Sequence, residues 1–117
     1  GGTWLYPRLF GHAKAAELMY TGRFMDVTEA GDLGFLNDVV PGEELIGKAQ
    51  DMARSIACGP PIATRLAKSM MRRGLSMDLK TSLEMAAVAE SITLSSNDHV
   101  EGMEALRQKR RPKFKGI

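Results

Sequence analysis

The chain has 117 residues, of which 44% are hydrophobic and 26% are charged, and its formal net charge is +2. This composition is typical of a water-soluble globular domain with one modest core. No apolar run approaches the ~20 residues that a membrane-spanning helix needs, and no secretory signal pattern opens the sequence, so we expect a soluble protein without a membrane partner. The use of a single cysteine fits a reducing, intracellular setting, so the expected localisation is cytoplasmic. The single cysteine, Cys58, excludes an intrachain disulfide and a paired-cysteine site, and its position at the end of a helical pattern predicts a buried, inert thiol.

The charge is unevenly distributed along the chain. Residues 1–106 hold ten Lys or Arg and fourteen Asp or Glu, whereas residues 107–117 hold six Lys or Arg and no acidic residue, so a net charge of −4 is followed by one of +6. A basic end of this kind can bind a polyanion, such as nucleic acid, an anionic membrane or a cofactor with several phosphates. A solvated C-terminus without a ligand is the alternative interpretation.

Three short helices are predicted in the first third of the chain. Apolar residues within 1–10 indicate a helix that Gly11 ends. Residues 13–20 are good helix formers and end at a Thr-Gly pair. Thr28 is a plausible N-cap for a third helix over 29–33.

Residues 35–40 form the one predicted strand. They include the β-branched Val39 and Val40 and end at Pro41. A lone strand cannot make a sheet, so it would have to pair with something outside this chain. The Gly-Gly start at Gly1, without a methionine, likewise suggests an excised segment.

The remaining two thirds of the chain are predicted to be helical. Residues 43–56 show a four-three-four apolar spacing, and Gly59-Pro60-Pro61 then breaks the chain. Further helices are predicted over 62–73 and 78–94. The four residues 98–101 have the form of an aspartate capping box that opens a last helix.

Glu90 lies on the main apolar stripe of the helix predicted over 78–94. That stripe consists of Leu79, Leu83, Ala86, Ala87, Glu90 and Leu94. A buried carboxylate is costly unless it is paired, so Glu90 either is exposed, where the stripe ends, or lies at the edge of a ligand cleft. In a cleft, desolvation would raise its pKa and suit it to proton transfer.

Familiar catalytic motifs are absent. The sequence has no phosphate-binding G-x-x-x-x-G-K-[ST], no G-x-G-x-x-G after a strand, no G-x-S-x-G and no H-E-x-x-H. The two histidines, His12 and His99, lie far apart at predicted helix starts, where surface or capping roles are more common than metal binding. We therefore assign no metal ligand.

Several short motifs occur at characteristic spacing along the whole chain. They are Gly1-Gly2-Thr3, Pro7-Arg8-Leu9-Phe10-Gly11, Ala13-Lys14-Ala15, Thr21-Gly22-Arg23, Ala30, Gly34-Phe35-Leu36-Asn37-Asp38-Val39-Val40-Pro41, Gly59-Pro60-Pro61, Ala67-Lys68, Asp98-His99-Val100-Glu101-Gly102-Met103-Glu104-Ala105, Lys109-Arg110, Pro112 and Phe114. In this order the chain resembles the C-terminal portion of enzymes of the enoyl-CoA hydratase/isomerase (crotonase) family.

This resemblance implies a fold class that is mainly α, namely the C-terminal helical (trimerisation) region of a crotonase-like ββα-spiral α/β fold, with one short strand. The chain would be a single region, 1–117, in which 1–42 form the end of the spiral core and 43–117 form a helical assembly region. Subunits would assemble as homotrimers, which often pair as hexamers.

The resemblance also implies an activity, the hydration or isomerisation of enoyl-CoA thioesters in fatty acid metabolism. The family stabilises an enolate with two backbone N–H groups, which would lie outside this chain, so no catalytic residue is assigned and the chain alone would be inactive. Lys109 is the residue most similar to a family contact with the nucleotide end of CoA, and Phe114 and Lys115 are weaker candidates. CoA would enter as part of the substrate, with no tightly bound cofactor.

Two alternatives stay open. A truncated, non-catalytic family member could act as an assembly or regulatory module. The basic end could also bind nucleic acid, although a single aromatic residue, Phe114, among the cations argues against it. Because one scaffold supports several reactions, the resemblance does not decide between hydratase and isomerase.

Overall fold

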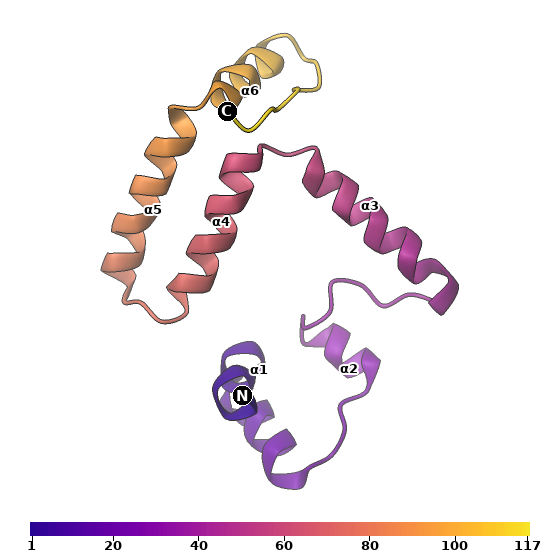
Figure 1. Cartoon of the computed structure of the whole chain (residues 1–117). Helices are drawn as coiled ribbons and strands as arrows, with labels where there is room; N and C mark the ends of the chain where they lie inside the picture. The colour runs from indigo at the N-terminus through magenta and orange to yellow at the C-terminus, as the bar shows by residue number, and fades with distance from the viewer. The chain divides into compact units, whose positions relative to one another are not determined.

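The computed structural model describes all 117 residues (Figure 1). Its secondary structure consists of six α-helices and one short 3₁₀ helix, joined by turns and irregular segments. The chain divides into two compact units, Gly1–Leu45 and Ile46–Ile117. The elements are α1 (Gly2–Thr21), α2 (Val27–Asp32), η1 (Gly42–Glu44), α3 (Leu45–Ala57), α4 (Pro61–Gly74), α5 (Leu79–Leu94) and α6 (Asn97–Arg107). No helix has the length and apolar character needed to span a membrane.

Helix α1 of the first unit is interrupted where the sequence predicts. Gly11 has φ 76° and ψ 164°, a conformation that only glycine adopts without strain. Gly22 ends the helix in the left-handed region, with φ 65°, and its N–H donates to the carbonyl oxygen of Leu18 at 3.1 Å. The two predicted helices on either side of Gly11 are therefore confirmed as two segments of α1.

Helix α2 begins at a different cap from the predicted one. Asp26, in an extended conformation, is the N-cap, and its carboxylate accepts a hydrogen bond from the N–H of Glu29 at 2.8 Å. The predicted N-cap, Thr28, lies inside the helix instead. Both residue types offer a capping oxygen, so the sequence pattern alone could not choose between them.

The predicted strand over 35–40 is not formed. The N–H of Phe35 donates to the carbonyl oxygen of Ala30 at 3.0 Å, which closes a turn after α2, and the N–H of Val39 donates to the side chain of the preceding Asp38. These bonds occupy main-chain donors that a sheet would use. The predicted fold class, a helical trimerisation region of a ββα-spiral fold with one short strand, is therefore wrong for this chain, whose fold class is all α.

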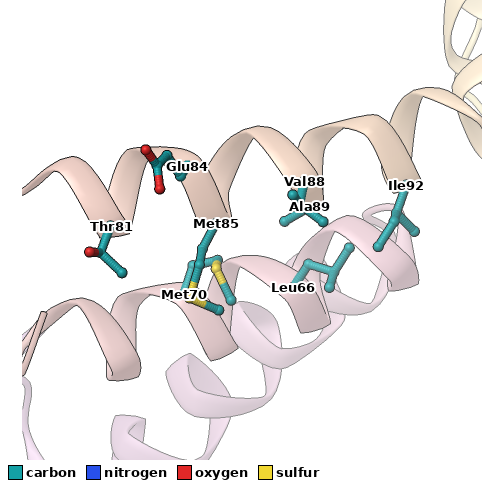
Figure 2. A pocket seen from close by; sticks show the side chains of 8 residues that line it. All are labelled: Leu66, Met70, Thr81, Glu84, Met85, Val88, Ala89 and Ile92. Carbon is teal, nitrogen blue, oxygen red and sulfur yellow. The ribbon is translucent and has the colours of Figure 1, made fainter.

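In the second unit, α4 and α5 pack side by side (Figure 1). Pro61 opens α4, and the carboxylate of Asp78 caps α5 by accepting the N–H of Thr81 at 2.9 Å. Figure 2 shows Leu66 and Met70 of α4 directed toward α5 across a shallow apolar groove of about 290 Å³. From α5 the groove is lined by Thr81, Glu84, Met85, Val88, Ala89 and Ile92.

The face of α5 that packs on α4 is not the predicted stripe. Leu83, in the middle of the predicted stripe, is 60% exposed, whereas Met85 and Ala89 are half-buried in the contact with α4. The helix carries apolar residues on more than one side, so periodicity could not identify the packed face. Glu90 is exposed, as the simpler of its two interpretations predicts.

Few side chains of the chain are buried. Ala15, Leu18, Ala30 and Ala105 are the buried apolar residues, and Asp98 is the one buried polar residue. The thiol of Cys58, predicted to be buried, is exposed after the end of α3. The described units give no information on the predicted roles of 1–42 and 43–117 as spiral core and assembly region, and that division stays a prediction.

Candidate functional site in the C-terminal segment

The residues predicted to bind CoA all lie in the ten residues after helix α6. We call these residues, 108–117, the C-terminal segment. Helix α6 is capped by Ser96, whose hydroxyl oxygen accepts the N–H of His99 at 3.2 Å. The predicted aspartate capping box is therefore wrong about the cap itself. Asp98 lies in the first turn of α6 and is free to bind elsewhere.

The carboxylate of Asp98 binds the main chain of the C-terminal segment. Its Oδ1 accepts the N–H of Lys115 at 2.7 Å, and its Oδ2 accepts the N–H of Gly116 at 2.8 Å. Asp98 is only 4% exposed, and these two bonds compensate for the cost of burying its charge. The N–H of Asn97 donates to the carbonyl oxygen of Ile117 at 2.9 Å, so the end of the segment lies against the start of α6.

Glu101, one turn further along α6, holds the middle of the segment. The guanidinium of Arg110 donates to both carboxylate oxygens, at 2.6 and 2.9 Å, and the N–H of Lys113 donates to Oε1 at 2.7 Å. Arg110, and secondly the Lys113 N–H, lower the pKa of Glu101 to about 2. The carboxylate is therefore ionised at neutral pH and binds its partners as an anion.

Lys109 has an unusual backbone conformation. It is the one non-glycine residue of the chain with a positive φ, 53°. Its N–H donates to the carbonyl oxygen of Leu106, and the N–H of Arg110 donates to that of Ala105, which is the pattern of a Schellman motif with Lys109 where glycine is usual. A left-handed lysine costs about 1 kcal/mol relative to glycine, and such strain is more common at functional sites than elsewhere.

The side-chain charges of the segment are mostly unpaired. Of its basic residues only Arg110 forms an ion pair within the chain, with Glu101. Lys109 and Lys115, both exposed, have no acidic partner. Arg111 also has an exposed side chain without a carboxylate, whereas the charge of the exposed Lys113 contributes to the lowered pKa of Glu101. The segment therefore presents three cations without a carboxylate, Lys109, Arg111 and Lys115, on a backbone that is fixed by hydrogen bonds.

Phe114, the third predicted binding residue, is half-buried and contacts α6. A methyl group added at Gly102 would lie 3.5 Å from Cε1 of the Phe114 ring. The ring also lines a cavity of about 260 Å³ with Pro60, Ile62 and Met103 among its other walls. The structure therefore brings Lys109, Phe114 and Lys115 into one segment, with the two ammonium groups exposed and the aromatic ring packed inward.

Asp98 and Glu101 are the residues that the sequence interpretation missed. Their partners lie 9 to 18 positions away along the chain. A helical pattern says nothing about such contacts, because it concerns residues three or four positions apart. The signal that was present is a group of three carboxylates within 98–104, followed by six basic residues within 107–115.

No other cluster of chemical groups stands out. No group of three or more His, Cys, Asp or Glu side chains is placed to hold a metal ion. His12 and His99 are both exposed. Lys14 and Arg23 form an ion-pair network with Glu17 and Glu29 in the first unit, in which every charge has a partner.

Comparison with known proteins gives the family. The sequence model of the family described as enoyl-CoA hydratase/isomerase matches residues 1–117. The chain is 36% identical to the mitochondrial methylglutaconyl-CoA hydratase of Rattus norvegicus over 120 residues, covering 99% of this chain and 38% of that protein. It is 35% identical over 116 residues to the enoyl-CoA isomerase/hydratase fer4 of Mycosarcoma maydis, covering 99% of this chain and 42% of that protein.

Solved structures agree with this result. The crystal structure of an enoyl-CoA hydratase from Bacillus anthracis matches with a TM-score of 0.94 and 42% identity, over 100% of this chain and 45% of that one. The chain belongs to the enoyl-CoA hydratase/isomerase family, so the family predicted from its motifs is confirmed. It spans less than half the length of these relatives.

Proposed function

We propose that the gene product that contains this chain hydrates or isomerises enoyl-CoA thioesters in fatty acid metabolism, and that the C-terminal segment binds the nucleotide end of the substrate. Family membership supports an acyl-CoA substrate. The relatives named above include a methylglutaconyl-CoA hydratase and an enoyl-CoA isomerase/hydratase, so both reactions occur among similar proteins. The oxyanion hole and the acid–base groups would be supplied from outside these 117 residues.

The observation that carries the proposal is the left-handed Lys109 at the end of α6. A glycine would make the same turn with less strain, so the lysine side chain has to contribute something other than the turn. The exposed ammonium has no acidic partner in the chain. A ligand that carries phosphates would provide the missing anion.

Lys115 and Phe114 complete the proposed contact. The Lys115 ammonium is exposed, while its N–H is bound by Asp98. Phe114 contributes mainly by packing the segment on α6 at Gly102. The proposed ligand is therefore CoA within the thioester, with no separate cofactor.

We also propose that the gene product is a homo-oligomer, a trimer or hexamer, and that it is located in the cytoplasm. Large apolar side chains such as Leu79, Leu83 and Val88 on α5 are more than half exposed in this chain. A helix with apolar residues on several sides is usually buried on several sides. Size-exclusion chromatography with light scattering would test the oligomer, and a strictly monomeric gene product would contradict it.

Isothermal calorimetry of CoA binding to the gene product at low salt tests the site. We expect Lys109→Ala to weaken CoA binding about tenfold, the effect of losing one charge-assisted contact. Lys80→Ala is the matched control, because Lys80 is an exposed lysine of α5 that lies 4.0 Å from Glu84. Unchanged affinity of the Lys109 variant would contradict the proposed contact.

An activity assay tests the reaction. The gene product is expected to hydrate a short 2-enoyl-CoA or to shift the double bond of a 3-enoyl-CoA, with the product identified by mass and by its ultraviolet absorbance. Absence of both reactions over a range of acyl-chain lengths would contradict the proposed activity, whatever the outcome of the binding measurement.

A further inference from the structure

Asp98 and Glu101, two of the three carboxylates on α6, bind the C-terminal segment, and three of their five hydrogen bonds go to its backbone. We propose that Asp98 and Glu101 are positioning residues, which fix the main chain of the segment so that its free lysines are held ready for the phosphates of CoA. This inference rests on the proposed role of the segment in CoA binding, and it adds the residues that make the segment a defined site.

The choice of partners of Asp98 is the first step of the argument. A carboxylate beside a lysine-rich segment would be expected to pair with an ammonium group. Asp98 instead accepts the main-chain N–H groups of Lys115 and Gly116, at 2.7 and 2.8 Å. The Lys115 ammonium is left exposed and without a carboxylate. The charge of Asp98 therefore orders the backbone and leaves the cation available.

Glu101 repeats this arrangement two residues earlier in the segment. Its Oε1 accepts the main-chain N–H of Lys113 at 2.7 Å, and the exposed Lys113 side chain adds a weaker charge interaction with the same carboxylate. Arg110 is the one basic side chain of the segment that Glu101 pairs with, in a two-pronged contact. A guanidinium in this geometry fixes direction as well as distance. Arg110 thus has a structural role, while Lys109, Arg111 and Lys115 are left without a carboxylate.

The free energy of ordering explains why such anchors matter for binding. Residues 107–117 carry six positive charges, which repel one another, and chain ends of this kind are disordered unless they are held. Binding of a ligand to a disordered segment has to include the cost of ordering it. Anchoring at Asp98 and Glu101 removes that cost before the ligand arrives, while two carboxylates are kept from neutralising the lysines.

Hydrogen–deuterium exchange and CoA calorimetry on the gene product, with Asp98→Asn and Glu101→Gln, test the proposal. Both changes keep the shape of the side chain and remove its negative charge. We expect the amides of residues 113–116 to exchange about tenfold faster or more, and CoA to bind about tenfold more weakly. Glu104→Gln is the matched control, because Glu104 lies on the same helix and binds Arg107 and Gln108, at the start of the segment, but not residues 112–117.

Comparison of CoA with 3′-dephospho-CoA separates positioning from a general loss of stability. If the anchors hold the lysines against phosphates, the wild-type protein prefers CoA over its dephospho form, and Asp98→Asn reduces that preference. A purely structural defect would weaken both ligands by the same factor and would overturn the proposal. Unchanged amide exchange in Asp98→Asn would also overturn it.

The outcome for the proposed function can be distinguished from these results. If Lys109→Ala does not weaken CoA binding, the segment is not the CoA site, and the positioning role is overturned with it. If Lys109→Ala weakens binding while Asp98→Asn frees the segment without changing affinity for either ligand, the CoA contact stands and the positioning role alone is overturned.

Discussion

In the first unit the side-chain cations of Lys14 and Arg23 both form ion pairs with glutamates, whereas most cations of the C-terminal segment form no ion pair. Arg23 binds both carboxylate oxygens of Glu29, at 2.6 and 2.7 Å, and also Glu17. Lys14 lies 2.9 Å from each of these glutamates. In the C-terminal segment, by contrast, Asp98 pairs with no cation at all.

The difference lies in what the carboxylates bind. In the first unit each glutamate binds side-chain cations, so charge is cancelled and α1 is tied to α2. On α6, Asp98 binds two main-chain N–H groups and Glu101 binds one in addition to Arg110, so the segment is ordered while Lys109 and Lys115 keep their charge exposed. Carboxylates can therefore form a neutral ion-pair network in one place and order a candidate anion site in another.

The largest effect is expected from breaking the ion-pair network in the first unit. Helix α2 has six residues and is too short to be stable by itself. Without the Arg23 guanidinium, Arg23→Ala should let the amides of Val27–Asp32 exchange almost as fast as in an unstructured peptide. CoA affinity should not change. Arg54→Ala, which breaks an exposed pair with Asp51 within α3, is the control and should alter neither quantity.

In both regions, acid should remove the stability contributed by the ionised carboxylates only at an unusually low pH. Arg23 first, and Lys14 second, lower the pKa of Glu29 to about 2, and Arg110 lowers the pKa of Glu101 to about 2, from 4.5 in the free side chain. Because both pKa values are depressed by folding, the carboxylates add stability that is fully present above pH 4.5 and is lost as the pH falls through about 2. Carbon-13 NMR titration of the carboxyl groups measures this directly, and midpoints near 4.5 would show that the pairs do not hold in solution.

The smallest effect is expected from relieving strain at Lys109. Lys109→Gly removes the left-handed lysine but gives the unfolded chain more freedom, so a net gain of about 0.5 kcal/mol in unfolding free energy is expected. Lys109→Ala keeps the strain and should not gain. Urea unfolding measures the free energy of unfolding of both variants. A Lys109→Gly variant that is less stable than Lys109→Ala would contradict the described turn.

Local backbone chemistry explains which parts of the fold the sequence could predict. Gly11, Gly22 and Pro61 end or begin helices because their allowed conformations are restricted or enlarged, and these boundaries are correct. The prediction of a strand over 35–40 was wrong because β-branched residues favour an extended backbone but do not supply a second strand to pair with it. On α5, apolar residues lie on several sides of the helix, so their periodicity could not identify the face that packs on α4.

The candidate site was predictable only in part. The family motif indicated Lys109, because its position in Lys109-Arg110 is a local feature of the sequence. The positive φ of Lys109 was not predictable, since nothing in the residue type requires it. The contacts of Asp98 with Lys115 and Gly116 span 17 and 18 positions and arise only when the segment turns back along α6. Sequence patterns of period two or 3.6 carry no information at that distance.

The central claim is that CoA binds the free lysines of the C-terminal segment and not the paired lysine of the first unit. Reductive methylation with carbon-13 labels each lysine while keeping its charge. NMR spectra of the labelled gene product, recorded during titration with CoA and assigned through single Lys→Arg variants, then report on each ammonium separately. We predict saturable shifts for Lys109 and Lys115 and no shift for Lys14. Unchanged signals of Lys109 and Lys115 at saturating CoA, or an equal shift of Lys14, would contradict the account.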